Sequence, residues 1–246
     1  MLCIKGGIMS DVPLAERAGD FTHYVSRSGV LKGHTDGVRT LAPLGGDLLA
    51  SGSWDRTVRL WNLRERKKIA DLSGHAQTVT SLAPFKGTLL ASGSLDKTVR
   101  LWDVERKRKI AVLKGHTASV KSLTTLSTPD SVLLASGSLD KTVRLWDVRQ
   151  RLEVAALSGH TEQVCSLTPL GGYLLASGSD DKTVRIWDVR KLRGVDVVGR
   201  SVTAVTSLAT LSPLGRDLLA IGSNSETVHI WDLQQRNTFA NLNGHT

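Results

Sequence analysis

Hydrophobic and polar residues alternate along most of the chain, and the alternation recurs in blocks of about 40 residues. In the stretch Thr98-Val99-Arg100-Leu101, polar and apolar side chains alternate with the period of a β-strand that buries one face. Short turns of Gly, Asp and Lys separate such runs, and no segment shows a sustained helical period with caps. Each block therefore predicts four short strands, which in the second block cover 78–84, 88–94, 98–104 and 109–115.

Five segments of the chain are near copies of one another. They read LASGSWDRTVRLWNL (49–63), LASGSLDKTVRLWDV (90–104), LASGSLDKTVRLWDV (134–148), LASGSDDKTVRIWDV (175–189) and LAIGSNSETVHIWDL (219–233). Their tryptophans, Trp61, Trp102, Trp146, Trp187 and Trp231, are spaced by 41, 44, 41 and 44 residues. The three extra residues fall between Leu123 and Leu133 and between Leu208 and Leu218, which predicts a surface turn at that point of the unit.

A four-stranded sheet on its own leaves two apolar faces uncovered, and radial repetition covers both by stacking one sheet on the next. The recurring Gly-His, Ser-Gly-Ser-x-Asp and Trp-Asp motifs resemble those of the WD-repeat β-propeller family over residues 33–246. The resemblance implies an all-β propeller of four-stranded antiparallel blades. We expect an irregular segment at 1–20 and a propeller at 21–246, with blades at about 37–73, 78–114, 119–158, 163–198 and 203–243.

The two ends of the repeat array carry incomplete units. Residues 24–31 precede the first Gly-His as an unpaired last strand would, and Gly244-His245-Thr246 open a unit that does not continue. Propellers of the resembled family usually close by pairing an N-terminal strand with C-terminal strands. We therefore expect five complete blades from a longer, seven-bladed ring that is truncated after Thr246, with a self-sufficient small ring as the alternative.

Histidine, serine and aspartate recur in every unit, a set that could suggest hydrolase chemistry. The same positions recur four times, whereas a catalytic site needs one distinct constellation, so we interpret them as structural. The resemblance implies a buried hydrogen-bond network, in which the serine of the first unit is Ser51 or Ser53. Its other members are His34/Asp55/Trp61, His75/Asp96/Trp102, His116/Asp140/Trp146 and His160/Asp181/Trp187.

The fifth unit departs from this pattern. It has Gly199-Arg200-Ser201 in place of Gly-His, and Ser225 in place of the aspartate. Two interpretations stay open: a decayed, less rigid blade, or a blade that has been released from its network to bind another molecule.

Positions that differ between copies are the candidates for partner recognition, because the repeated ones build the scaffold. Just before each turn aspartate they are Trp54, Leu95, Leu139, Asp180 and, by alignment, Asn224. After each Gly-His they are Asp36, Gln77, Ala118 and Glu162. The resemblance implies that both sets lie around the central channel. Trp54 is either a binding hot spot or an aromatic lid over its own blade.

Basic residues concentrate in the turns between the third and fourth strands. The chain has 32 Lys and Arg against 23 Asp and Glu, and fourteen of the 32 lie in 64–68, 106–109, 149–151, 190–193 and 234–236. This pattern favours either solvated turns or a basic arc for an acidic protein, a nucleic acid or an anionic lipid surface. The turns have no aromatic residues, which argues against recognition of single-stranded bases. Trp-Asp-x-Arg also resembles the boxes of cullin-RING ligase substrate receptors, which makes Arg149 and Arg190 candidate ligase-adaptor contacts.

Composition narrows the remaining possibilities. With 40% hydrophobic and 22% charged residues the chain is globular, and no apolar run approaches the 20 residues of a membrane span. Two cysteines, Cys3 and Cys165, support neither a disulfide framework nor a zinc site, which predicts a cytoplasmic protein or, alternatively, a nuclear one. No residue stands out as catalytic, cofactor-binding or metal-binding. The sequence therefore predicts a non-enzymatic scaffold for partner proteins. The alternatives are a substrate-recognition subunit of a cullin-RING ligase and a basic-rim component of a ribonucleoprotein complex.

Overall fold

The computed structural model describes residues 30–85, 88–128, 131–200, 203–211 and 217–244. These residues form twenty β-strands in five separate sheets, and in each sheet four strands pair antiparallel in chain order. The predicted all-β architecture of four-stranded antiparallel blades is thereby confirmed. The N-terminal segment at 1–20 and most of the predicted strand at 24–31 lie outside the described residues, and Val30 and Leu31 are not in a strand.

The strands are 5 to 8 residues long. Sheet 1 contains β1 (Val38–Gly45), β2 (Leu48–Ser53), β3 (Val58–Asn62) and β4 (Lys67–Leu72). Sheet 2 contains β5 (Val79–Pro84), β6 (Leu89–Ser94), β7 (Val99–Asp103) and β8 (Arg108–Leu113). Sheet 3 contains β9 (Val120–Ser127), β10 (Val132–Ser138), β11 (Val143–Asp147) and β12 (Leu152–Leu157). Sheet 4 contains β13 (Val164–Gly171), β14 (Leu174–Ser179), β15 (Thr183–Asp188) and β16 (Arg193–Arg200), and sheet 5 contains β17 (Val205–Leu211), β18 (Leu218–Ser223), β19 (Thr227–Asp232) and β20 (Asn237–Asn243).

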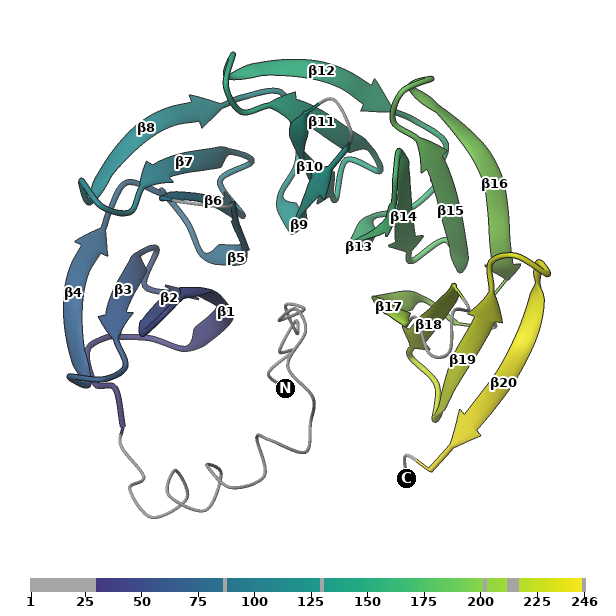
Figure 1. The fold of residues 1–246 in the computed structure, drawn as a ribbon, viewed down its shortest axis with the longest axis horizontal. Coiled ribbons are helices and arrows are strands. Elements are labelled where there is room, and N and C mark those ends of the chain that lie inside the picture. Colours follow the sequence, from purple (N-terminus) through teal and green to yellow (C-terminus); the bar gives the residue numbers. More distant parts are fainter. Residues whose placement is uncertain (1–29, 86–87, 129–130, 201–202, 212–216, 245–246) are drawn as a thin grey trace.

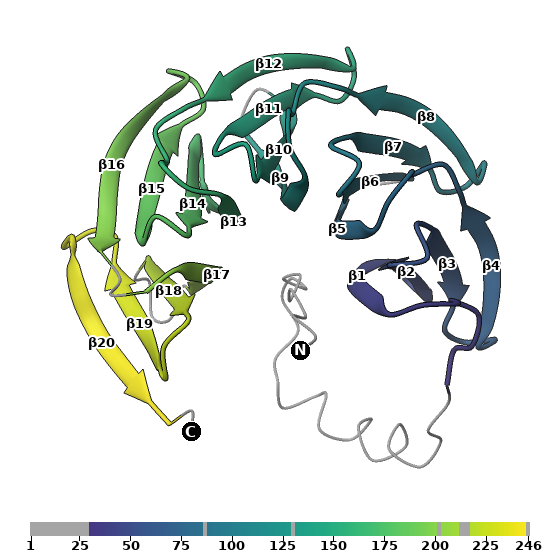
Figure 2. The same cartoon turned by 180° about the vertical axis from the view of Figure 1, so that it is seen from behind.

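The five sheets follow one another around a common centre, as the blades of a propeller do. The first strand of each sheet lies innermost and the fourth lies on the outer circumference (Figure 1). The same arrangement seen from behind shows that the described sheets form an open arc, with sheets 1 and 5 at its two ends (Figure 2). Innermost strands of consecutive sheets contact each other, β1 with β5, β5 with β9, β9 with β13 and β13 with β17.

The hydrophobic core lies between neighbouring sheets. One cluster combines Val58 and Leu60 of sheet 1 with Val79, Leu90 and Trp102 of sheet 2, all of them buried. Equivalent clusters join sheets 2 and 3, 3 and 4, and 4 and 5. Sheets 2 to 4 thus bury both faces against their neighbours, and sheets 1 and 5 each bury one face against the neighbouring described sheet. This burial of apolar surface is the physical reason that such short strands form a stable fold.

A glycine at the centre of each Ser-Gly-Ser motif permits this close stacking in the first four sheets. A Cβ added at Gly137 of sheet 3 would lie 2.7 Å from Cγ1 of Val164 in sheet 4, and one at Gly52 would lie 2.6 Å from Cγ1 of Val79. In sheet 5 the constraint is relaxed, because a Cβ at Gly222 would have its nearest neighbour at 3.5 Å. The glycines of this motif are therefore required by inter-sheet packing and not by turn geometry.

The register between the third and fourth strands shifts at the same place in every sheet. The irregularity lies immediately before the tryptophan, between Leu60 and Trp61 in sheet 1 and between Leu145 and Trp146 in sheet 3. Such a bulge increases the local twist and re-aims the side chain that follows it. It places the tryptophan where its indole N–H faces the second strand of its own sheet.

No helix in the described ranges is long and apolar enough to cross a membrane.

Candidate functional site

Each sheet presents two ends to solvent, and the two differ in chemistry. At one end, the loop that leads into the sheet meets the turn between its second and third strands, as the hydrogen bond of 2.9 Å from the Trp54 N–H to the Gly37 carbonyl shows. We call this end the histidine face, and it comprises residues 33–37 and 54–57 of sheet 1 and the equivalent residues of sheets 2 to 4. The opposite end carries the turns between first and second strands and between third and fourth strands, and we call it the basic-turn face.

On the histidine face, sheet 3 shows how the recurring polar residues are connected. The His116 Nδ1 lies 2.7 Å from Asp140 Oδ2, and its Nε2 lies 2.7 Å from Ser136 Oγ. The Trp146 indole N–H donates to the same serine oxygen at 2.8 Å. The Asp140 carboxylate also accepts from the hydroxyl of Thr142 at 2.6 Å and from the Thr117 N–H at 3.0 Å. The loop, the turn and two strands of the sheet are thereby joined by one chain of hydrogen bonds.

Sheets 1, 2 and 4 repeat this arrangement with almost the same distances. The His–Asp distance is 2.7 Å for His34 and Asp55, 2.8 Å for His75 and Asp96, and 2.7 Å for His160 and Asp181. The serine is the earlier of the two in each Ser-Gly-Ser motif, namely Ser51, Ser92, Ser136 and Ser177. The sequence alone leaves the choice between Ser51 and Ser53 open. Ser53 instead donates to the Asp36 carbonyl at 3.1 Å and accepts from the Asp55 N–H at 3.0 Å.

These residues lie in the protein interior. The tryptophans of sheets 1 to 4 are at most 3% exposed, and the side chains of His75, His116 and His160 are at most 1% exposed. Each histidine also packs edge-on against its tryptophan, with ring centroids 6.0 to 6.3 Å apart. A substrate cannot approach a nucleophile in such a position, so the geometry serves to hold the loop on the sheet.

Donor and acceptor roles in the network follow from the charges. Burial lowers the pKa of His116 and of His160 below the ordinary value, against the opposing effect of the aspartates, so both rings are neutral near pH 7. Burial by itself would raise the pKa of Asp181, but hydrogen bonds from Thr183, Thr161 and His160 outweigh it and lower that pKa to about 2. An ionised carboxylate only accepts, so the histidine donates from Nδ1 and its Nε2 accepts from the serine hydroxyl. The indole N–H completes the chain by donating to the serine oxygen.

In the described part of sheet 5 this network is absent. Ile221 occupies the position of the network serine and Ser225 that of the aspartate, and within the described residues the Trp231 indole nitrogen is buried without a hydrogen-bond partner. The side chains of the Gly199-Arg200-Ser201 segment lie outside the described residues. The substitution of the serine by Ile221 was readable in the sequence, as Leu-Ala-Ile-Gly-Ser, but was missed.

The candidate partner-binding residues all lie on the histidine face, but the structure separates them by availability. Trp54 is 54% exposed, with its ring near Gly37 of the loop that leads into sheet 1, while Leu95 and Leu139 are half-buried. Asp180 is engaged within the chain, because its carboxylate accepts from the Cys165 thiol at 3.1 Å and from the Gln163 amide. Burial raises the pKa of the Cys165 thiol to about 12, with Asp180 adding to the effect, so this cysteine is not a reactive nucleophile. The remaining candidates Asn224, Asp36, Gln77 and Glu162 are exposed.

Sequence reasoning missed one feature of this face, the residue after the turn aspartate. Arg56, Lys97, Lys141 and Lys182 adopt positive φ angles of 69° to 71°, and all four are exposed. Lys141 crosses to the next sheet, where its Nζ donates to the Thr161 carbonyl at 2.6 Å and lies 3.4 Å from Glu162 Oε1. The repeated basic residue in the Asp-Lys-Thr or Asp-Arg-Thr triplet was the available signal.

The basic-turn face carries the charge that the sequence indicates. Arg106, Lys191 and Arg236 have acidic partners there, whereas in the described residues Arg64, Arg66 and Lys107 have no ion pair. The two candidate adaptor contacts, Arg149 and Arg190, are exposed at the starts of equivalent turns in sheets 3 and 4. Arg190 lies 5.3 Å from the ring centroid of Tyr173, a cation–π distance.

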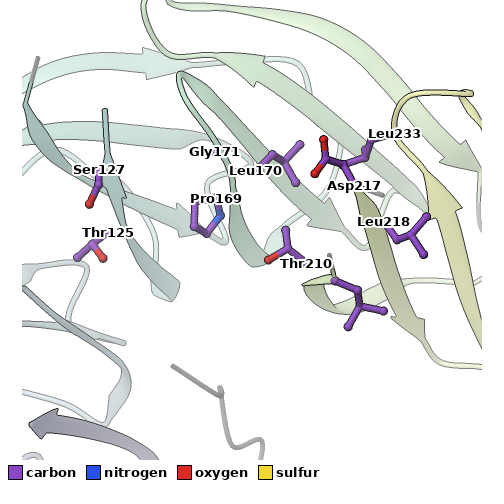
Figure 3. Close-up of a pocket in the computed structure, with 10 residues that line it drawn as sticks. Thr125, Ser127, Pro169, Leu170, Gly171, Thr210, Asp217, Leu218 and Leu233 are labelled. Carbon is purple, nitrogen blue, oxygen red and sulfur yellow. The ribbon is translucent and has the colours of Figure 1, made fainter. Parts of the chain in front are cut away.

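A cavity of about 350 Å³ opens on the basic-turn face between sheets 3, 4 and 5 (Figure 3). Apolar side chains line it, among them Pro169, Leu170, Leu218 and Leu233, and of its described lining residues Asp217 alone ionises. Neither the cavity nor any other part of the described chain gathers three or more His, Cys, Asp or Glu residues that could hold a metal ion.

Two comparisons with known proteins agree with this geometry. The sequence profile of the WD domain, G-beta repeat, matches residues 26–62, 66–103, 107–147 and 152–188. The chain is also similar to the F-box/WD repeat-containing protein pof1 of Schizosaccharomyces pombe, with 47% identity over 51 residues. That match covers 21% of this chain and 8% of the relative, so the chain matches far less than two thirds of the relative's length.

Proposed function

The chain belongs to the WD40 repeat family, and we propose that it is a non-enzymatic scaffold that docks segments of partner proteins on its histidine face. The proposal rests on the division between repeated and variable residues. The repeated His, Ser, Asp and Trp side chains are buried in the networks of sheets 1 to 4, and they leave no polar group of the network available for substrate. The side chains left at the surface differ from sheet to sheet, as residues that recognise one particular partner would.

Trp54 is the observation that carries the proposal. Its backbone is held by the hydrogen bond to Gly37, yet its side chain is 54% exposed, and large aromatic side chains dominate binding energy at protein interfaces. A tryptophan that only covered its own sheet would be buried, as the four network tryptophans are. Leu95 and Leu139 extend the apolar surface along the same face on sheets 2 and 3.

The experiment places a photo-crosslinking amino acid at position 54 and compares Trp54→Ala with Leu152→Ala. Leu152 is 60% exposed on the outer strand β12 and is the matched control for loss of an exposed apolar side chain. We expect position 54 to crosslink a partner protein, and Trp54→Ala to lose at least tenfold in capture of that protein with an unchanged melting temperature. Equal loss from Leu152→Ala, or unfolding of Trp54→Ala with no separate binding defect, would contradict the proposal.

A second candidate is the substrate-recognition subunit of a cullin-RING ubiquitin ligase. It is favoured by the exposed positions of Arg149 and Arg190 on neighbouring sheets and by the similarity to an F-box/WD repeat-containing protein. In this case the double variant Arg149→Ala, Arg190→Ala loses co-purification of a ligase adaptor while its melting temperature stays unchanged. Adaptor binding that survives the double variant would remove this candidate.

A third candidate is a basic-rim component of a ribonucleoprotein complex, favoured by the unpaired cations of the basic-turn face. Such binding would be driven by phosphates, so the affinity for a duplex oligonucleotide would fall steeply between 50 and 200 mM salt. Salt-insensitive partner binding would favour the scaffold. For each of the three candidate functions we propose a cytoplasmic location, with the nucleus as the alternative. Imaging of the tagged protein checks this location.

A further inference from the structure

On the histidine face, the turn between the second and third strands of each of sheets 1 to 4 carries a basic side chain, and one contact shows what such a side chain binds. Lys141, on the turn between β10 and β11, reaches the loop that leads into sheet 4 and meets a carboxylate there, that of Glu162, at 3.4 Å. Its ammonium group also donates to the Thr161 carbonyl at 2.6 Å. The junction between sheets 3 and 4 is therefore closed by an ion pair that the chain itself supplies.

The two preceding junctions have the cation but not the carboxylate. Arg56 and Lys97 occupy the same turn position in sheets 1 and 2, with the same φ of 70°, and both side chains are exposed. Gln77 and Ala118 stand where Glu162 stands at the third junction. In the described part of the chain, neither Arg56 nor Lys97 has an ion pair.

The turn of one sheet and the loop of the next are also adjacent at the second junction. At the junction of sheets 2 and 3, the Ser119 hydroxyl donates to the Leu95 carbonyl at 3.2 Å, which shows that turn and loop are adjacent there too. The nearest acidic neighbours in sequence, Asp55 and Asp96, do not neutralise the cations at the surface, because their side chains are only 5% and 7% exposed inside the networks. Asp140 is placed in the same way beside Lys141, which pairs with Glu162 all the same.

The backbone conformation of these cations is the same at each junction. Basic residues at a positive φ occur on both faces, since Arg66 and Lys107 of the basic-turn face also adopt it. The backbone therefore holds Arg56 and Lys97 in the same conformation as Lys141, and within the described residues they differ from Lys141 in lacking a carboxylate partner.

We propose that the junctions of sheets 1 and 2 and of sheets 2 and 3 bind carboxylates of an acidic linear segment of a partner protein. These carboxylates would take the place that Glu162 takes at the third junction, while apolar residues of the segment pack on Trp54 and Leu95. A protein segment fits better than a nucleic acid, because single cations separated by apolar side chains do not form a continuous row for a phosphate backbone. The inference rests on the proposed docking function and specifies the chemistry of the ligand.

The experiment uses a fluorescein-labelled peptide of twelve residues, with glutamates and one phenylalanine, and measures its affinity for the full chain by anisotropy. The test variant is Arg56→Asn, Lys97→Asn, in which asparagine tolerates the positive φ. The matched control is Arg66→Asn, Lys107→Asn, which removes two exposed cations at φ 54° and 52° from the basic-turn face. We expect about tenfold weaker binding for the test variant and less than twofold for the control, since each exposed pair contributes about threefold.

Two further variants change the number of junctions whose cation lacks a carboxylate partner. One variant raises this number and the other lowers it. Glu162→Ala frees Lys141 and is expected to tighten peptide binding about threefold. Ala118→Glu supplies Lys97 with an internal carboxylate and is expected to weaken binding about threefold. Because both residues are exposed or half-buried loop positions outside the networks, neither change is expected to lower the melting temperature.

Several outcomes would overturn the inference. One is an equal or larger loss from the control variant, and another is equal affinity for a peptide with glutamine in place of glutamate. A duplex oligonucleotide that displaces the peptide and loses affinity in the Arg56, Lys97 variant would assign the surface to nucleic acid. If the glutamine peptide binds and still depends on Trp54, the acidic ligand fails while the docking function stands. Failure of the crosslink at position 54 would refute the docking function itself.

Discussion

Replacing His116 with alanine removes the central member of the sheet 3 network and leaves its neighbours in place. The substitution breaks two hydrogen bonds of 2.7 Å, one to Asp140 and one to Ser136. It also removes the ring that packs edge-on against Trp146. The loop that leads into sheet 3 then stays attached to the turn through three bonds: the Thr117 N–H donates to Asp140, the Leu139 N–H to the Ser119 carbonyl at 2.9 Å, and the Ser138 hydroxyl to the Ala118 carbonyl at 3.1 Å.

The expected cost follows from which groups are left without partners. A hydrogen bond to an ionised acceptor contributes about 1.5–3 kcal/mol and a neutral one about 1 kcal/mol. Asp140 keeps its bonds from the Thr142 hydroxyl and N–H at 2.6 and 3.0 Å, and the Ser136 proton can turn toward the Arg144 carbonyl at 3.5 Å. These remaining bonds limit the penalty, so we expect the free energy of unfolding to fall by about 2–3 kcal/mol.

The assay is urea denaturation followed by tryptophan fluorescence and circular dichroism, with His229→Ala as the matched control. Within the described residues, the imidazole of His229 in sheet 5 hydrogen-bonds to the Asn241 side chain at 2.8 Å and is half-buried outside any network, so its loss is expected to cost less than about 0.5 kcal/mol. His116→Ala should lower the urea midpoint clearly more than the control. If the two variants had the same urea midpoint, the recurring histidines would not stabilise the sheets through the network as the geometry indicates.

Three further predictions concern packing, pH and coupling. Gly137→Ala places a Cβ 2.7 Å from a neighbouring sheet and is expected to destabilise by about 1–3 kcal/mol, whereas Gly222→Ala, with 3.5 Å of room, is expected to be tolerated; equal melting temperatures would contradict the packing argument. Burial lowers the pKa of His160, so as pH falls through 6.5 the unfolded chain takes up a proton that the folded chain does not, and stability should fall. Stability should fall further from about pH 4 to pH 2, because Asp181 is protonated first in the unfolded state. Urea midpoints at pH 7, 5 and 3 check this, and a midpoint that rises on acidification would refute it. Finally, a double-mutant cycle of His160→Ala with Asp181→Ala should show a coupling of about 1–2 kcal/mol, and strict additivity would argue against a shared network.

The repeats made much of the fold readable from the sequence. The alternation in Thr98-Val99-Arg100-Leu101 predicts one strand. Five copies of the same segment indicate that this strand recurs in equivalent surroundings. The membership of the network was predictable for the same reason, since a set of residues repeated four times points to architecture. The choice between Ser51 and Ser53 was not, because two serines separated by one glycine lie on the same face of a strand and differ only in their distance from the turn. Only the folded loop shows that His34 meets Ser51, whereas Ser53 meets the Asp36 carbonyl.

The binding surface could be predicted only in part. The sequence singled out Trp54 and Asp180 by the same criterion, variation between copies, but one is exposed and the other is held by Cys165 and Gln163. Whether Lys141 and Lys97 are paired depends on a loop of the next sheet, which lies about twenty residues further along the chain. Local sequence cannot show this, because the contact is created by the stacking of sheets.

The sequence by itself determined that the chain forms β-strands in repeated groups of four, which residues recur, and where its charge is concentrated. These properties are local or periodic, and a one-dimensional pattern records them fully. The tertiary structure decided which polar groups are buried in the interior, which cations lack a carboxylate, and which apolar side chains, Trp54 among them, stay at the surface. Burial and pairing depend on what the neighbouring sheet places within a few ångströms, and only the folded arrangement of the sheets brings those neighbours together.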